Sequence, residues 1–227
     1  MGINRAPQVN RWITLVLGTF LTTAGITLSV RADLGVLALS TPSYTISRIT
    51  GLNLGLVQFF YYTSLVLLQI PILGKRFQTR NLLQIPFALL MSVFITLTGR
   101  LFAFIHFESY PLNMAVLLLG ICSTAFGVFL LLEANLVINA PEGLAKAVSV
   151  ASSLSVSTAK ILVDIALVVL AACLGLLFLH RIVGIREGTL LSAVLIGKLV
   201  GMIPKPIKHR VHRFCNGQDE AAPPAQV

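Results

Sequence analysis

The chain has 227 residues, of which 56% are hydrophobic and 11% are charged. Soluble domains carry roughly 25% charged residues, so this composition excludes an ordinary water-soluble domain and indicates a polytopic membrane protein. The net charge of +9 comes from basic residues that are scattered between apolar runs and collected near the C-terminus. Because this is the charge bias of a membrane protein, we expect the lipid bilayer as its partner and no nucleic acid.

Six apolar runs are long enough, or nearly long enough, to cross a bilayer as helices. They cover residues 12–31, 55–73, 82–104, 112–132, 158–179 and 188–204. Two further segments, 34–50 and 136–153, are apolar but are interrupted by Gly, Pro and polar residues. Irregular backbone at membrane depth must be buried in protein or line a cavity. We therefore predict an all-α transmembrane bundle of about six spans with two broken or re-entrant segments.

The two halves of the chain resemble each other. An offset of 102 residues places Gly18 on Gly120 and gives seven identities in the 18 positions of residues 17–34. The same offset places Asp33 on Asn135, its near-isostere. We therefore predict two structural repeats, each built around one helix-breaking segment.

The repeat divides the chain into a cytoplasmic N-terminus, two membrane repeats and a tail. These parts cover residues 1–11, 12–104, 105–204 and 205–227. The tail is basic and then rich in proline and alanine, so we expect it to be disordered. Three spans per half would make the repeats inverted and four would make them parallel, and both arrangements fit the sequence.

Basic residues are distributed unevenly over the predicted loops. With the N-terminus inside, ten Lys and Arg residues lie on the cytoplasmic side and five on the opposite side. Because basic loops are retained in the cytoplasm, we expect both termini there.

Each broken segment carries a helix-start signal. Ser40-Thr41-Pro42 and Asn139-Ala140-Pro141-Glu142 each place a capping side chain before a proline. The N–H groups of such half-helix starts would point inward with a partial positive charge, which suits an anion or a carboxylate. Asp33 and Asn135, where each half leaves its first helix, are expected to bond unpaired backbone groups near the same site.

The start of the fifth run and the residues just before it carry polar side chains at helical spacing. Ser153, Ser157, Lys160 and Asp164 are four, three and four residues apart, so we predict that they share one helical face. An unpaired Lys or Asp at a helix centre costs about 2.5–3.5 kcal/mol on the insertion scale, so such residues usually face a bundle interior. The face is interpreted as a binding or proton-relay site, with a structural buried pair or a snorkelling lysine as the alternative.

The last run contains a further lysine in an apolar context. Lys198 lies between Gly197 and Gly201, a spacing that permits close helix approach. It is interpreted either as a packing site or as a lysine that reaches toward the membrane interface.

Two segments carry a resemblance to a known family. SVRADLGVLALSTPSYTIS (residues 29–47) and GIREGTLLSAVLIGKLVGMIPKP (residues 184–206) resemble the YczE/YitT-like small bacterial integral membrane proteins. That family has a K-A-D-L-G-like segment after its first helix and a G-x-G-T-hydrophobic-G-P-like segment in its last. The match spans residues 12–204, and Lys198 stands where the family more often has proline. The resemblance implies a bacterial inner-membrane protein associated with transport, and it names no substrate.

We expect secondary transport of a small anionic or zwitterionic solute, with a non-transporting scaffold or accessory factor of a biosynthetic or export complex as the alternative. The sequence contains no HExxH, GxSxG or Walker motif and no clustered His or Cys, so we expect no enzyme, metal or cofactor. The candidate substrate-binding residues are Asp33, Thr41, Tyr44, Gln58, Tyr62, Asn135, Asn139, Glu142, Ser157, Lys160, Asp164 and Lys198.

Overall fold

The computed structural model describes residues 5–216, and over this range the regular structure is entirely helical. The α-helices in chain order are α1 (Arg5–Ala32), α2 (Thr41–Thr50), α3 (Leu54–Leu73), α4 (Gln84–Leu101), α5 (Tyr110–Ala134), α6 (Ala140–Ser152), α7 (Val156–Leu179), α8 (Glu187–Met202) and α9 (Lys205–Asn216). Three short 3-10 helices, η1 (Ala38–Ser40), η2 (Gly74–Arg76) and η3 (Thr79–Leu83), lie between them. The predicted all-α bundle is confirmed.

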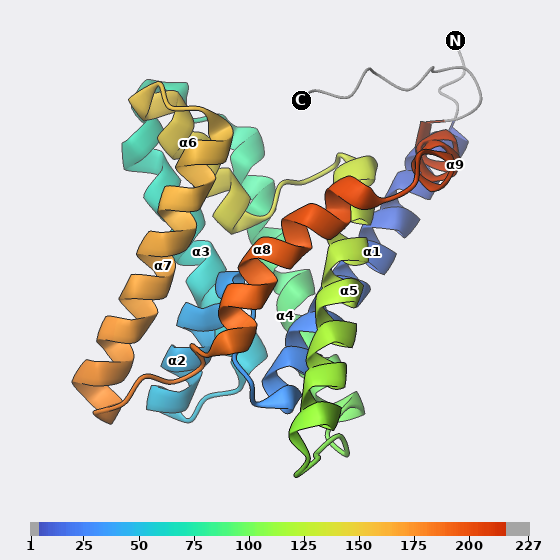
Figure 1. Cartoon of the computed structure of the whole chain (residues 1–227). Coiled ribbons are helices and arrows are strands. Elements are labelled where there is room, and N and C mark those ends of the chain that lie inside the picture. Colours follow the sequence, from blue (N-terminus) through green and yellow to red (C-terminus); the bar gives the residue numbers. More distant parts are fainter. Residues whose placement is uncertain (1–4, 217–227) are drawn as a thin grey trace.

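The long helices cross the bundle in alternating directions (Figure 1). We call the end where α1 begins and α9 lies the terminal end, and the other the opposite end. Helices α1, α4 and α7 run toward the opposite end, whereas α3, α5 and α8 run back (Figure 1). Five helices are apolar and long enough to cross a membrane, and α8 with α9 forms a sixth candidate bent by 79°. The chain is an integral membrane protein.

The two broken segments are re-entrant, as predicted. After α1 the chain turns back into the bundle, where Leu37 and Ser40 are fully buried, and α2 then leads out to the exposed Gly51. The segment after α5 does the same from the terminal end, because α6 begins beside the buried Asn139 and ends at the exposed Ser153 (Figure 1). Neither short helix crosses the bundle.

The caps of these helices follow the 102-residue repeat. Asn53 and Ser155 are equivalent positions, and the side chain of each accepts a hydrogen bond from the first turn of α3 or α7. Gly51 and Ser153, which end α2 and α6, are both in the left-handed region with φ of 70° and 58°. The repeat therefore extends well beyond the stretch where the sequence identities lie.

Helices α1 and α5 form the most extensive interface of the described chain, and its contacts are symmetric. A Cβ added at Gly18 would lie 2.9 Å from the carbonyl oxygen of Gly127, and one at Gly120 would lie 2.9 Å from that of Gly25. Gly18 of α1 lies against Gly127 of α5, and Gly25 lies against Gly120. The residue numbers of the contacts therefore increase along α1 and decrease along α5, so the two helices are antiparallel. Equivalent helices that run in opposite directions place the pseudo-two-fold axis in the membrane plane, and the repeats are therefore inverted.

The C-terminal part corrects one prediction. Residues 205–216 are not disordered but form α9, which contacts α1 and α5. His212 Nδ1 lies 3.2 Å from Glu133 Oε2, and the Cys215 thiol donates to Thr14 Oγ1 at 3.3 Å. These contacts explain the order of α9, while residues 217–227 of the predicted tail lie outside the described residues.

Candidate functional site

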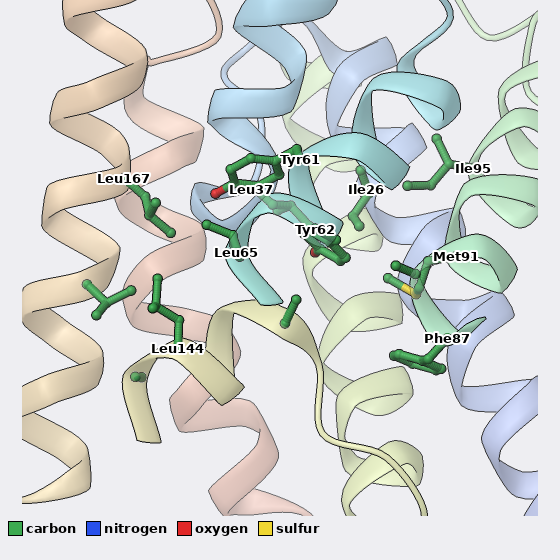
Figure 2. Close-up of a cluster of buried hydrophobic side chains, with 14 of the residues drawn as sticks. Ile26, Leu37, Tyr61, Tyr62, Leu65, Phe87, Met91, Ile95, Leu144 and Leu167 are labelled. Atoms are coloured by element: carbon green, nitrogen blue, oxygen red, sulfur yellow. The ribbon is translucent and has the colours of Figure 1, made fainter. Parts of the chain in front are cut away.

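One pair of equivalent interfaces differs between the repeats. Helices α3 and α4 pack closely along each other, whereas α7 and α8, both fully described, have no comparable interface. On α4 the positions facing the core are filled by Leu90, Met91 and Ile95. Their equivalents on α8 are Ser192, Ala193 and Gly197. Figure 2 shows Met91 and Ile95 in the buried cluster with Tyr62 and Ile26.

The smaller α8 side chains leave a cavity of about 190 Å³ between α7 and α8. Lys160 and Asp164 of α7 and Glu142 of α6 line it, together with Ala38 and Leu39 at the inner end of the first re-entrant segment. We call this space the charged cavity. The predicted pairing is present, because Lys160 Nζ lies 3.2 Å from Asp164 Oδ2.

The charges in the cavity do not balance. Lys160 and Asp164 form an ion pair with each other, but the half-buried Glu142 has no ion-pair partner among the described residues. Glu142 also lies in the first turn of α6, where a carboxylate interacts favourably with the helix dipole. The sequence led us to expect that this half-helix start would attract an anion. Instead, a carboxylate of the chain already stands there.

Several buried polar atoms near the charged cavity have no hydrogen-bond partner within the described chain. They include the hydroxyl oxygens of Ser40 and Tyr61, whereas the Tyr62 hydroxyl lies within hydrogen-bonding reach of Asn139 and Gln58. Neither Ser40 nor Tyr61 lines the charged cavity itself, but Leu39, next to Ser40 in the chain, does. Unpaired buried polar atoms are costly, so a cluster of them beside a cavity can serve a polar ligand.

The predicted helix starts are present, but their capping differs. The Asn139 side chain accepts a hydrogen bond from the N–H of Ala140 at 3.0 Å, so it caps α6. Thr41 is fully buried and donates to the carbonyl of Leu37 at 3.2 Å, while Ser40 makes no side-chain cap. Gln58 accepts a hydrogen bond from Ser43, which ties α3 to the start of α2.

The candidate residues Ser157 and Lys198 lie away from the charged cavity. Ser157 is exposed, and Ser153 belongs to the end of α6, so only part of the predicted polar face exists. Lys198 is exposed, and a Cβ added at Gly197 or Gly201 would meet no atom within 4 Å. Within the described chain, no helix therefore packs closely at this spacing, and the position of Lys198 fits the alternative of an exposed lysine.

The expectation that Asp33 and Asn135 bond unpaired backbone groups is also wrong. Both side chains are exposed, and neither makes a hydrogen bond among the described residues. What they share is a left-handed backbone, which short polar residues tolerate. Tyr44, the remaining candidate, is half-buried and faces Arg48, whose guanidinium carbon lies 5.9 Å from the ring centroid. It lines no part of the charged cavity.

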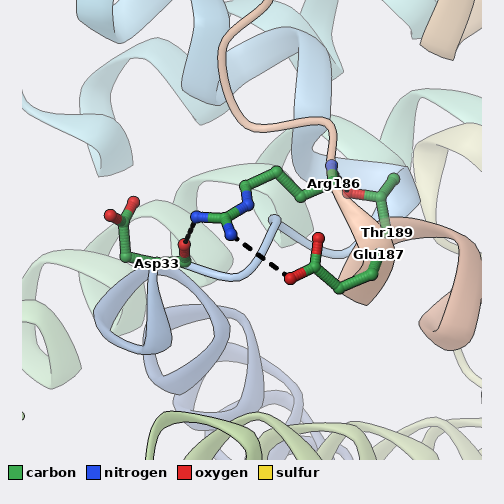
Figure 3. Close-up of polar contacts among 4 residues, drawn as sticks. All are labelled: Asp33, Arg186, Glu187 and Thr189. Carbon is green, nitrogen blue, oxygen red and sulfur yellow. Dashed lines mark hydrogen bonds and ion pairs between the residues drawn. The ribbon is translucent and has the colours of Figure 1, made fainter. Parts of the chain in front are cut away.

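The two motifs that carried the family resemblance contact each other (Figure 3). Arg186 Nη1 donates to the carbonyl of Asp33 at 2.7 Å, and the N–H of Gly188 donates to that of Leu34 at 2.8 Å. Thr189 Oγ1 donates to the carbonyl of Val36 at 2.8 Å. We call these contacts the motif lock. It fixes the first helix break against the start of α8.

Sequence reasoning missed the part of the site on α8. Ser192, Ala193 and Gly197 carry no chemical signal alone, but the 102-residue offset sets them against three larger residues on α4. That difference in volume could have indicated the cavity. Among the described residues, no group of three His, Cys, Asp or Glu side chains could hold a metal ion.

These features define a polytopic membrane protein of two inverted repeats, in which residues of both re-entrant segments line a charged cavity. The chain belongs to a family of unknown function, DUF6198, whose model matches residues 9–205. The match covers both repeats, the motif lock and the charged cavity. Neither the curated proteins nor the solved structures contain a significant match to the chain.

Proposed function

We propose that the protein is a secondary transporter of a small zwitterionic solute that binds in the charged cavity. The observation that carries this proposal is the meeting of Glu142, Lys160 and Asp164 in one cavity, next to the inner end of a re-entrant segment. Inverted repeats with discontinuous helices commonly place a transported solute at such a point.

The charge count favours a zwitterion over a plain anion. The cavity holds the carboxylates of Glu142 and Asp164 and the ammonium group of Lys160. A bound anion would add repulsion to the two carboxylates, whereas the ammonium group of a zwitterion near Glu142 would offset the excess negative charge. The solute's carboxylate can then approach Lys160, the cationic side chain that lines the cavity. A volume of about 190 Å³ limits the solute to a small molecule.

The proposal also assigns a cellular setting. The resemblance of the two motif segments to YczE/YitT-like proteins supports a bacterial inner membrane, and the basic loops support cytoplasmic termini. Hydrogen bonds from Asn10 to Phe214 and from Cys215 to Thr14 join the start of α1 to α9, which supports the proposal that both ends of the chain lie on one side of the membrane.

The test is thermal unfolding of the purified protein against zwitterionic amino acids, dicarboxylates and monoamines. A ligand at 100 times its Kd stabilises the folded state by about 2.7 kcal/mol. We expect stabilisation by a zwitterion and its loss in Lys160→Met/Asp164→Leu. The double change keeps a buried charge from being stranded, so folding should persist. Lys198→Met is the matched control, because it removes an exposed lysine that does not line the cavity. A response that survives in the double variant would place the site elsewhere.

A non-transporting accessory role is the second candidate. The open faces of Gly197 and Gly201 and the exposed Leu190 of α8 would accept a helix of a partner protein. If Gly201→Leu, which lies outside the lining of the charged cavity, abolishes a co-purifying complex while no solute stabilises the wild-type protein, the accessory role is favoured over transport.

A further inference from the structure

Two pockets adjoin at the second helix break, on the terminal end of the bundle. The first, of about 210 Å³, is lined by the basic residues Arg80 and Lys146 and by the amides of Gln78, Asn81, Gln84 and Asn135. The second, of about 310 Å³, is lined mainly by apolar residues, among them Trp12, Leu15, Pro86 and Phe87. Arg80, Leu83, Leu136 and Val137 line both pockets, so the two are continuous.

These pockets occupy the place that the motif lock fills in the other repeat. The offset sets residues 135–138 against 33–36 and residues 82–87 against 184–189. The motif lock depends on Gly188 and Thr189. At the equivalent positions of the other repeat, the chain has Pro86 and Phe87. No hydrogen bond joins segment 135–138 to residues 80–87 in the described structure. The second break therefore stays open where the first is sealed.

The first pocket is polar and basic and the second is mainly apolar, and an amphiphilic ligand needs both kinds of lining. Two cationic side chains and several amides stand in the first pocket, and neither pocket is lined by a carboxylate. Basic residues and amide donors bind phosphate oxygens, whereas the second pocket, apart from Arg80 at its junction with the first, offers mainly hydrocarbon contact. We propose that the second helix break is a binding site for an anionic phospholipid, with its head group at Arg80 and Lys146 and an acyl chain beside Trp12.

The geometry favours a lipid over a soluble anion. Arg80 stands at the junction of the two pockets, as the phosphate of an amphiphile stands between head and tail. Trp12 is 52% exposed on the outer surface of α1, which borders the bilayer. The site lies on a different helix break from the motif lock and shares no lining residue with the charged cavity, so it is independent of the proposed transport.

Trp12 is the only tryptophan of the chain, which makes the test direct. The full-length protein is reconstituted in vesicles that contain acyl-brominated phosphatidylglycerol or acyl-brominated phosphatidylcholine at the same mole fraction, and quenching of Trp12 fluorescence is measured. Each basic residue near a membrane surface strengthens the attraction of anionic lipid roughly fivefold, so we expect a preference for phosphatidylglycerol of about tenfold or more.

The variant Arg80→Gln/Lys146→Gln should bring the two lipids within about twofold of each other. Both residues are exposed, so the variant should fold, which its melting temperature would verify. The control Lys75→Gln/Lys205→Gln removes two exposed charges that line neither pocket, and it should keep the preference. Equal quenching in the wild type would overturn the proposal. So would a preference that survives Arg80→Gln/Lys146→Gln, or competition by soluble glycerol phosphate, which would indicate a site for a free anion.

Discussion

Asp33 and Asn135, which are 102 residues apart in the chain, hold the same left-handed backbone conformation, with φ of 51° and 48°. Each follows the last helical residue of the first helix in its repeat, at the point where the chain turns back into the bundle. Because α1 and α5 are antiparallel, the same kind of helix break occurs at opposite sides of the membrane, after α1 and after α5.

We predict that Asn135 tolerates glycine but not a β-branched residue. Its side chain is exposed and makes no hydrogen bond, so a change acts mainly through the backbone. Asn135→Gly should unfold at the same temperature as the wild type or higher, whereas Asn135→Val should lose about 1–2 kcal/mol. Asp33→Gly and Asp33→Val should behave alike. Equal stability of the Gly and Val variants would show that the backbone is not left-handed.

The buried amides of Gln69 and Gln84 are predicted to be strongly coupled. They exchange two hydrogen bonds, of 3.0 and 3.2 Å, across the α3–α4 interface. A single change to Leu strands one buried amide and should cost about 1–3 kcal/mol, while the double change should cost less than either single change. A double-mutant cycle of unfolding free energies measures this. Additive losses would contradict the pairing.

Filling the charged cavity should remove solute binding without unfolding the protein. Ala193→Met/Gly197→Ile gives α8 the residues that its equivalent, α4, already carries at Met91 and Ile95. The melting temperature should change little, and stabilisation by solute should disappear. Val194→Met, an exposed residue outside the cavity lining, is the matched control. If the filled variant still responds to solute, the cavity is not the binding site.

The architecture was largely predictable from sequence, because apolar length and helix-breaking residues determine membrane helices locally. The re-entrant segments and the repeat followed from Gly18, Gly120 and the Asp33/Asn135 match. Whether the repeats are inverted or parallel was not predictable, since it depends on α2 and α6 turning back and not crossing. That is a tertiary property, which the antiparallel contacts of Gly18 and Gly120 reveal.

The candidate site was only partly predictable. Lys160, Asp164 and Glu142 were identified, because ionisable residues in apolar segments need a partner or a cavity. Lys198 satisfies the same reasoning, and Ser157 shares the helical spacing of Lys160 and Asp164. Both nevertheless lie outside the cavity, since the rotation of each helix is set by packing that no local pattern encodes. The cavity itself arises from what α8 lacks relative to α4, and only a comparison of the two repeats makes this visible.

The inverted repeat is tested most directly at Leu52 and Leu154, two exposed and equivalent residues that follow α2 and α6. Each is changed to Cys in a chain whose three native cysteines have been replaced, and a membrane-impermeant thiol reagent is applied to intact and to permeabilised cells. We predict that Leu52→Cys reacts in intact cells and that Leu154→Cys, on the side of the termini, reacts only after permeabilisation. Labelling of both from the same side would mean that the repeats are parallel and would contradict the inverted architecture.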